Sequence, residues 1–257
     1  ASLAATSFSM SLTIISLYTK TARGARQSRD ITPLRHSLRV FGNTSRMQND
    51  PVQKMSARHI AESAFDAVYL TASLSLAIGL FAAEKALWGA AVLTLFVGDC
   101  LHLVPRVRRF ATGKPCAAER LGKAAASVTM TLFYVLLWWR AALLSSVDAV
   151  SATAVITLAA VRVALCFVPR SFSKDEPSFL PLLRNVPFVA LGAVAATQLG
   201  MLFPPRAAAL AAAIAIALSF VFYLPVVALS KRDPKVGALM IPKSCTYLLI
   251  AALGFAI

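Results

Sequence analysis

The chain has 257 residues, of which 58% are hydrophobic and only 14% charged, and its mean hydropathy is +0.70. Soluble domains carry a charge on about a quarter of their residues, so this composition excludes an ordinary water-soluble domain. The formal net charge of +15 would suit nucleic acid if the basic residues formed one surface, but they fall between long apolar runs, so we expect no nucleic-acid partner.

Residues 1–60 differ from the rest of the chain. They are rich in Ser and Thr, and the first fifty hold seven Lys or Arg against only Asp30 and Asp50. This composition is typical of an organellar transit peptide and also of a disordered cytoplasmic tail, and both interpretations stay open. The choice between an organellar membrane and the plasma membrane stays open with them.

Seven apolar runs follow, each close to the ~20 residues that cross a ~30 Å hydrocarbon core. Backbone polar groups in lipid must find their partners within the segment, so these runs predict helices. The predicted fold of residues 61–257 is therefore an all-α bundle of transmembrane helices. The predicted spans lie near residues 66–83, 86–104, 124–144, 150–169, 185–203, 207–229 and 238–257.

Basic residues concentrate in every second connection between the predicted spans. Nine lie in 20–58, six in 105–123, three in 170–184 and three in 231–235, whereas the alternate connections hold little more than Lys85, Arg140 and Arg206. With seven spans, all the basic connections fall on one side of the membrane. The positive-inside rule then predicts that the N-terminus lies inside and the C-terminus outside.

Charged side chains within spans are functional candidates, because each costs about 2.5–3.5 kcal/mol on insertion scales. At the end of the second span, Asp99, His102 and Arg106 are spaced i, i+3 and i+7, so they share one helix face. We expect these groups to point into the bundle together and Pro105 to end the helix. In the alternative, Arg106 extends to lipid head groups and Asp99 bonds a neighbouring helix.

Lys243, in the last span, allows two interpretations. Its side chain extends to the interface, or it pairs with Asp99 and ties the second span to the seventh. Arg162 lies deep in the fourth span and competes for the same acid, since Asp66 and Glu84 stand at span ends. A lysine that carries retinal would lie nearer mid-membrane, and we expect no cofactor.

Arg184 and Asn185 stand at the predicted entrance to the fifth span, with Pro187 in its first turn, where proline is tolerated. Arg184 would meet a lipid phosphate there or anchor the topology. The four cysteines show no CxxC spacing, and we predict no metal site. The candidate catalytic residues are Asp99 and His102, and the candidate ligand-binding residues are Arg106, Tyr134, Arg162, Arg184, Asn185, Lys243 and Tyr247.

The segment 98–106, with sequence GDCLHLVPR, resembles the lysoplasmalogenase family of multi-pass membrane proteins. Members carry a Gly-Asp pair followed by apolar residues and, in some, a Leu-x-Pro-Arg ending. Residues 127–134 and 247–254 resemble other family helices more weakly, and the likeness covers about 66–257. The chain is also similar to uncharacterised bacterial multi-pass proteins that share this segment, an Arg-Asn-x-Pro-Phe stretch and an Ile-Pro-Lys stretch.

The resemblance implies an intramembrane hydrolase that cleaves the vinyl-ether bond of lysoplasmalogens with two acidic residues. One acid would protonate the vinyl ether and the other would activate water. Asp99 matches the first acid. The second acid of the family follows a serine in a late span, and the corresponding place here is Ser219-Phe220, which has no carboxylate. His102 is then the candidate second group, since histidine titrates near neutral pH.

From these residues we expect a polar pocket toward the inner side, lined by Asp99, His102, Arg106, Arg184 and Lys243. Several cations suit an anionic membrane lipid or lipid-like ligand. The alternatives are hydrolysis of that lipid, small-molecule or proton-coupled transport, and a non-catalytic binding or receptor-like bundle.

Overall fold

The computed structural model describes residues 57–113, 118–146, 149–173, 175–230 and 232–257, so most of the predicted N-terminal segment lies outside it. Within these ranges the chain is helical and contains no strand. Seven helical segments are long and apolar enough to cross a membrane, which confirms the predicted fold class. The helices are α2 (Ala57–Ala82), α3 (Ala86–Thr112), α4 (Ala118–Ala142), α5 (Ala149–Cys166), α6 (Phe179–Gly200), α7 (Ala207–Leu229) and α8 (Met240–Leu253), with 3-10 turns η1 (Pro234–Leu239) and η2 (Gly254–Ala256) before and after α8.

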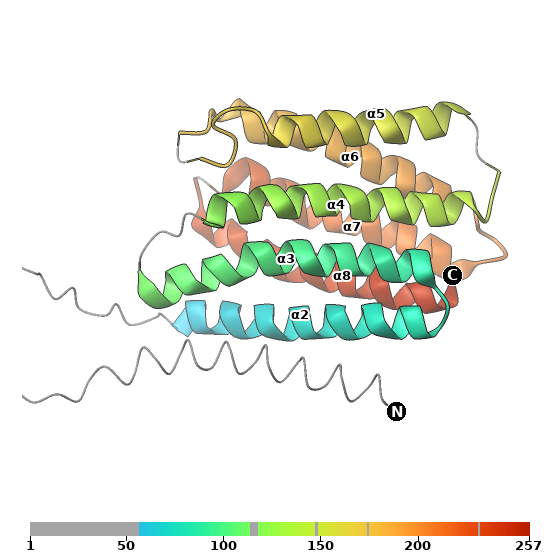
Figure 1. Ribbon diagram of the computed structural model, residues 1–257, viewed down its shortest axis with the longest axis horizontal. Coiled ribbons are helices and arrows are strands. Elements are labelled where there is room, and N and C mark those ends of the chain that lie inside the picture. Colours follow the sequence, from blue (N-terminus) through green and yellow to red (C-terminus); the bar gives the residue numbers. More distant parts are fainter. Residues whose placement is uncertain (1–56, 114–117, 147–148, 174, 231) are drawn as a thin grey trace, which may run out of the picture.

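The helices run up and down and close into a ring. Each packs against its neighbours in the chain, and α8 returns to contact α2, while α4 also touches α6. Figure 1 shows α2 to α5 nearer the viewer and α6 to α8 behind them. The last turns of α3, α5 and α7 and the first turns of α4, α6 and α8 therefore lie at one end of the bundle, beside the start of α2. This end carries the basic connections that the sequence predicted for one side.

Three prolines, Pro105, Pro187 and Pro225, lie inside helices of the described ranges, and the first two correct predictions. We expected Pro105 to end the second span, but α3 continues through it to Thr112. A proline cannot bond the carbonyl four residues earlier, which here belongs to Leu101. Gly122 of α4 packs against that carbonyl so closely that a Cβ would overlap it. Pro187 lies well inside α6 rather than in its first turn, because α6 already begins at Phe179.

Close packing fills the half of the bundle away from the basic connections. Trp88, which is 1% exposed, donates from Nε1 to the Ile250 carbonyl at 3.1 Å and so joins α3 to α8. A side chain at Gly254 would overlap the same indole. Farther along the core, Tyr134 and Phe220 stack with ring centroids 5.7 Å apart. Since this half is packed mostly with apolar groups, most of the polar groups inside the bundle lie in the other half; Gln198, which donates to Ser145 Oγ, is an exception.

Candidate functional site

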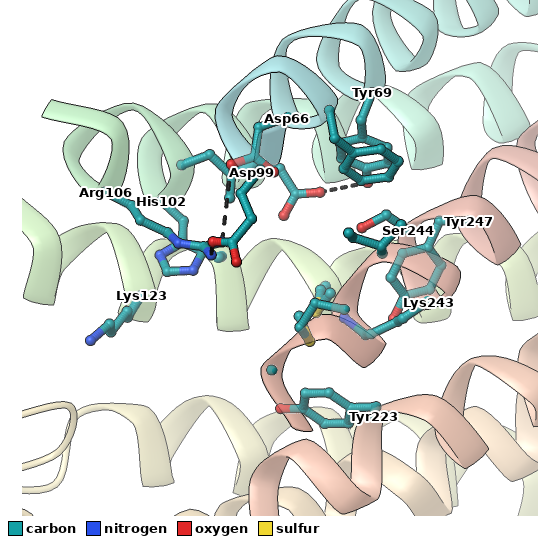
Figure 2. Close-up of a pocket in the computed structure, with 18 of the residues that line it drawn as sticks. Asp66, Tyr69, Asp99, His102, Arg106, Lys123, Tyr223, Lys243, Ser244 and Tyr247 are labelled. Carbon is teal, nitrogen blue, oxygen red and sulfur yellow. Dashed lines mark hydrogen bonds and ion pairs between the residues drawn. The ribbon is translucent and has the colours of Figure 1, made fainter. Parts of the chain in front are cut away.

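A cavity of about 260 Å³ lies in the half of the bundle nearer the basic connections (Figure 2). A cavity needs only about 10–15 Å³ on this measure to hold one water, so it can accommodate a small polar molecule. All helices except α6 contribute to its wall. The polar side chains of the wall are Glu62, Asp66, Tyr69, Asp99, His102, Arg106, Lys123, Ser127, Arg162, Tyr223, Lys243, Ser244 and Tyr247.

One wall of the cavity carries the acidic groups and is built by α2 and α3 (Figure 2). Tyr69 Oη donates to Asp99 Oδ2 at 2.6 Å, so the first partner of Asp99 is a phenol of the neighbouring helix. Arg106 pairs through Nη2 with Glu62 Oε2 at 2.8 Å and approaches Asp66 Oδ2 to 4.0 Å through Nη1. Arg106 therefore balances acids of α2, with a side chain that remains 28% exposed.

The opposite wall carries Lys243 of α8, whose ammonium points into the cavity in Figure 2. Its side chain is buried, with the residue 2% exposed, and Nζ lies 4.7 Å from the ring centroids of both Tyr223 and Tyr247. Within the described ranges, neither Lys243 nor Arg162 comes within 4.0 Å of a carboxylate oxygen, including those of Asp99. Neither basic residue that the sequence offered as a partner for Asp99 forms a direct ion pair with it.

Arg162 is held in the interior by neutral groups. It is 1% exposed, and its Nε donates to Thr131 Oγ1 at 2.9 Å. Nη1 donates to the Arg184 carbonyl and to Asn185 Oδ1, both at 3.4 Å, while the guanidinium lies over the Phe188 ring at 3.5 Å from its centroid. None of its hydrogen bonds to the described part of the chain uses Nη2. Arg162 also lines the cavity, which makes its guanidinium a candidate donor to a molecule inside it.

Arg184 lies outside the cavity wall and fastens the α5–α6 connection. Its Nη1 donates to Ser171 Oγ at 2.7 Å and pairs with Glu176 Oε1 at 2.8 Å, and its guanidinium covers the Phe172 ring. Phe172 in turn lines the cavity. The structure thus places Arg184 as an anchor for a wall residue. Asn185, also outside the wall, accepts through Oδ1 from Tyr223 Oη at 2.9 Å.

The structure brings together most, but not all, of the predicted site residues. Tyr134 does not line the cavity; its hydroxyl lies 3.3 Å from Ser219 Oγ, in the aromatic core. Arg184 and Asn185 act behind the wall. The predicted residues that line the cavity are Asp99, His102, Arg106, Arg162, Lys243 and Tyr247.

Sequence reasoning missed the contribution of α2. We expected the first span to begin near residue 66, whereas α2 begins at Ala57 and carries Glu62, Asp66 and Tyr69 into the wall. These three residues are spaced i, i+4 and i+7, which places them on one helix face. That spacing was a usable signal, but a hydropathy window hides it because the first turns of α2 are polar. The other polar wall residues that we did not predict are Lys123, Ser127, Tyr223 and Ser244.

Three wall atoms are buried and have no hydrogen-bond partner among the residues the structure describes: His102 Nδ1, Asp66 Oδ2 and Tyr247 Oη. Buried polar atoms in native proteins are nearly always bonded, and each exception requires an explanation. Two of the three residues, Asp66 and Tyr247, are 7% and 2% exposed. The wall therefore presents free donors and acceptors to the space that it encloses.

No group of three or more His, Cys, Asp or Glu that could hold a metal ion occurs in the described ranges. Comparisons with protein-family models, with curated proteins and with solved structures found no match for this chain.

Proposed function

We propose that this chain is an integral membrane protein that binds an anionic, lipid-like ligand, with the polar head of the ligand in the cavity between Asp99 and Lys243. The observation that supports this most directly is the state of Lys243. Lys243 is a cation that is 2% exposed and lines the cavity. Two tyrosine ring centroids lie 4.7 Å from its Nζ, and no carboxylate oxygen of the described residues lies within 4.0 Å of it.

Burying an ammonium costs several kcal/mol unless an anion accompanies it. Two aromatic rings offset part of this cost, since a desolvated cation–π contact contributes about 2 kcal/mol. An anionic ligand would supply the missing partner. The apolar part of such a ligand would contact Phe65, Leu103 and Met130, which line the same cavity.

The first experiment identifies what the protein binds. The full chain, purified in a mild detergent, is analysed by unbiased mass spectrometry for lipids that remain bound, beside Lys243→Met and Lys235→Met. Lys235 is an exposed lysine outside the cavity wall, so it is the matched control. We expect an anionic amphiphile with the wild type and Lys235→Met, and a marked loss with Lys243→Met. The same lipids at the same level in all three preparations would contradict the proposal.

Hydrolysis of the bound lipid is a second candidate function, supported by the acidic wall. Asp99 and His102 line one cavity from the same face of α3, and His102 Nδ1 is free among the described residues. Tyr69 holds Asp99 through Oδ2 only, which leaves Oδ1 for a water or a substrate. A carboxylate and an imidazole at one site suit a general acid and base. The resemblance of segment 98–106 to lysoplasmalogenases suggests the vinyl-ether bond as the target.

The test is release of fatty aldehyde from a lysoplasmalogen by the purified protein. Asp99→Asn should lower turnover at least a hundredfold, since general acid–base groups contribute about 10²–10⁴-fold. Asp175→Asn, at an exposed aspartate of the α5–α6 connection, is the control. Equal turnover in wild type and Asp99→Asn would remove this candidate. If a lipid binds without turnover, binding remains the function, and flux across proteoliposomes would then show whether the ligand is carried.

A further inference from the structure

We infer that the ligand carries a phosphate monoester, a tetrahedral dianion, held between Arg162 and Lys243. This rests on the proposed function and specifies the chemistry of the same site. A free phosphate ion and the terminal phosphate of a lipid share this chemistry.

Two buried cations from different helices, Arg162 of α5 and Lys243 of α8, line the same cavity. Lys243 Nζ lies 4.7 Å from the Tyr223 ring centroid, and Tyr223 Oη donates to Asn185 Oδ1, which also accepts from Arg162 Nη1. Tyr223 therefore contacts the Lys243 ammonium with its ring, and its hydroxyl shares the Asn185 oxygen with the Arg162 guanidinium. No carboxylate of the described residues lies within 4.0 Å of either cation; Glu62 and Glu176 pair with Arg106 and Arg184 instead. Two like charges buried together favour an occupant with two negative charges.

The donors at this wall also match an anion with three terminal oxygens. They are Lys243 Nζ, the unused Nη2 of Arg162, and Tyr247 Oη, which is buried without a partner among the described residues. A carboxylate has two oxygens and one charge, whereas a phosphate monoester has three acceptor oxygens and a charge near −2 at neutral pH. Hydrogen bonds between such charged groups are about twice as strong as neutral ones.

The position of Arg162 is set before any ligand arrives. Thr131 holds Nε, Asn185 and the Arg184 carbonyl hold Nη1, and the Phe188 ring lies beneath the guanidinium plane. The single free edge of the guanidinium therefore has a fixed direction. A site whose donors are locked by surrounding contacts loses little entropy on binding, which favours one anion geometry over others.

The test compares three probes that share a dodecyl chain: dodecyl phosphate, dodecanoate and dodecanol. Each is titrated into the full chain in maltoside micelles by calorimetry, and inorganic phosphate is added as a competitor. We expect dodecyl phosphate to bind at least about tenfold more tightly than dodecanoate, and dodecanol to bind most weakly. Competition by inorganic phosphate would identify a site that also takes the free ion. Its failure to compete would restrict the site to phosphate on an alkyl chain, and both results support the inference.

Two variants test the contacts. Tyr247→Phe removes only an oxygen that bonds nothing in the described ranges, so the fold should be retained, and affinity for dodecyl phosphate should fall about tenfold. Arg162→Lys keeps a cation in place but removes the second donor and should weaken dodecyl phosphate more than dodecanoate.

Equal affinities for dodecyl phosphate and dodecanoate in the wild type would overturn the phosphate assignment while leaving the proposed function in place. So would unchanged dodecyl phosphate binding in Tyr247→Phe and Arg162→Lys. If neither charged probe binds more tightly than dodecanol, the proposed function itself fails.

Discussion

Replacing Lys243 by methionine should make the ligand-free protein more stable. Methionine keeps an unbranched side chain, one heavy atom shorter, and removes the charge, while the neighbouring rings of Tyr223 and Tyr247 remain to pack against it. A residue that stabilised the fold would show the opposite sign. The sign of the change in the free energy of unfolding therefore distinguishes a lysine that binds a ligand from one that stabilises the fold.

The size of the effect follows from the surroundings of Nζ. The desolvation of a buried ammonium costs several kcal/mol. Two ring contacts at 4.7 Å offset about 2 kcal/mol each. We expect Lys243→Met to raise the free energy of unfolding by about 1–3 kcal/mol, in the range found when buried ionic groups are replaced by apolar ones. Lys235→Met, at an exposed position, should change it by less than about 0.5 kcal/mol.

The assay is unfolding of delipidated protein in mixed micelles, followed by the fluorescence of the three tryptophans. With a saturating anionic amphiphile the order should reverse, because a ligand at about 1,000 times its Kd adds ~4.1 kcal/mol to the wild type and little to the variant. If Lys243→Met is less stable than the wild type by more than about 1 kcal/mol without ligand, protein groups already satisfy the ammonium. The case for an anionic ligand would then be refuted.

Two further changes test how the walls are held. Gly122→Ala places a Cβ against the Leu101 carbonyl and should destabilise the protein by about 1–3 kcal/mol, since a backbone atom cannot rotate away. Gly200→Ala is the control, because a Cβ there has nothing within 4 Å, and it should be neutral or stabilising. Equal unfolding midpoints for the two variants would contradict the close α3–α4 contact. Arg106→Gln and Glu62→Gln, made alone and combined, form a double-mutant cycle for the 2.8 Å ion pair between α3 and α2. The expected coupling free energy is about 0.5–3 kcal/mol. Additive changes in the free energy of unfolding would show that this pair does not join the two helices.

The sequence alone determined the helices and one face of the site. An apolar run of about twenty residues can satisfy its backbone in lipid only as a helix, so the spans follow from composition and length. The spacing of Asp99, His102 and Arg106 is equally local, and the structure places all three on the cavity wall. The same logic applied to α2 would have added Asp66 and Tyr69, whose spacing the polar first turns obscured.

Only the tertiary structure decided which partner each polar group takes. Asp99 bonds Tyr69 and has neither Lys243 nor Arg162 within 4.0 Å. The packing of α2 against α3 brings the phenol close, whereas Lys243 of α8 lies on the opposite wall of the cavity. Arg184 looked like a ligand contact in the sequence and instead anchors a connection through Glu176. These choices depend on side chains from helices far apart in the chain. Each of these interhelical contacts contributes at most a few kcal/mol and joins residues far apart in the sequence, so no local sequence pattern predicts it.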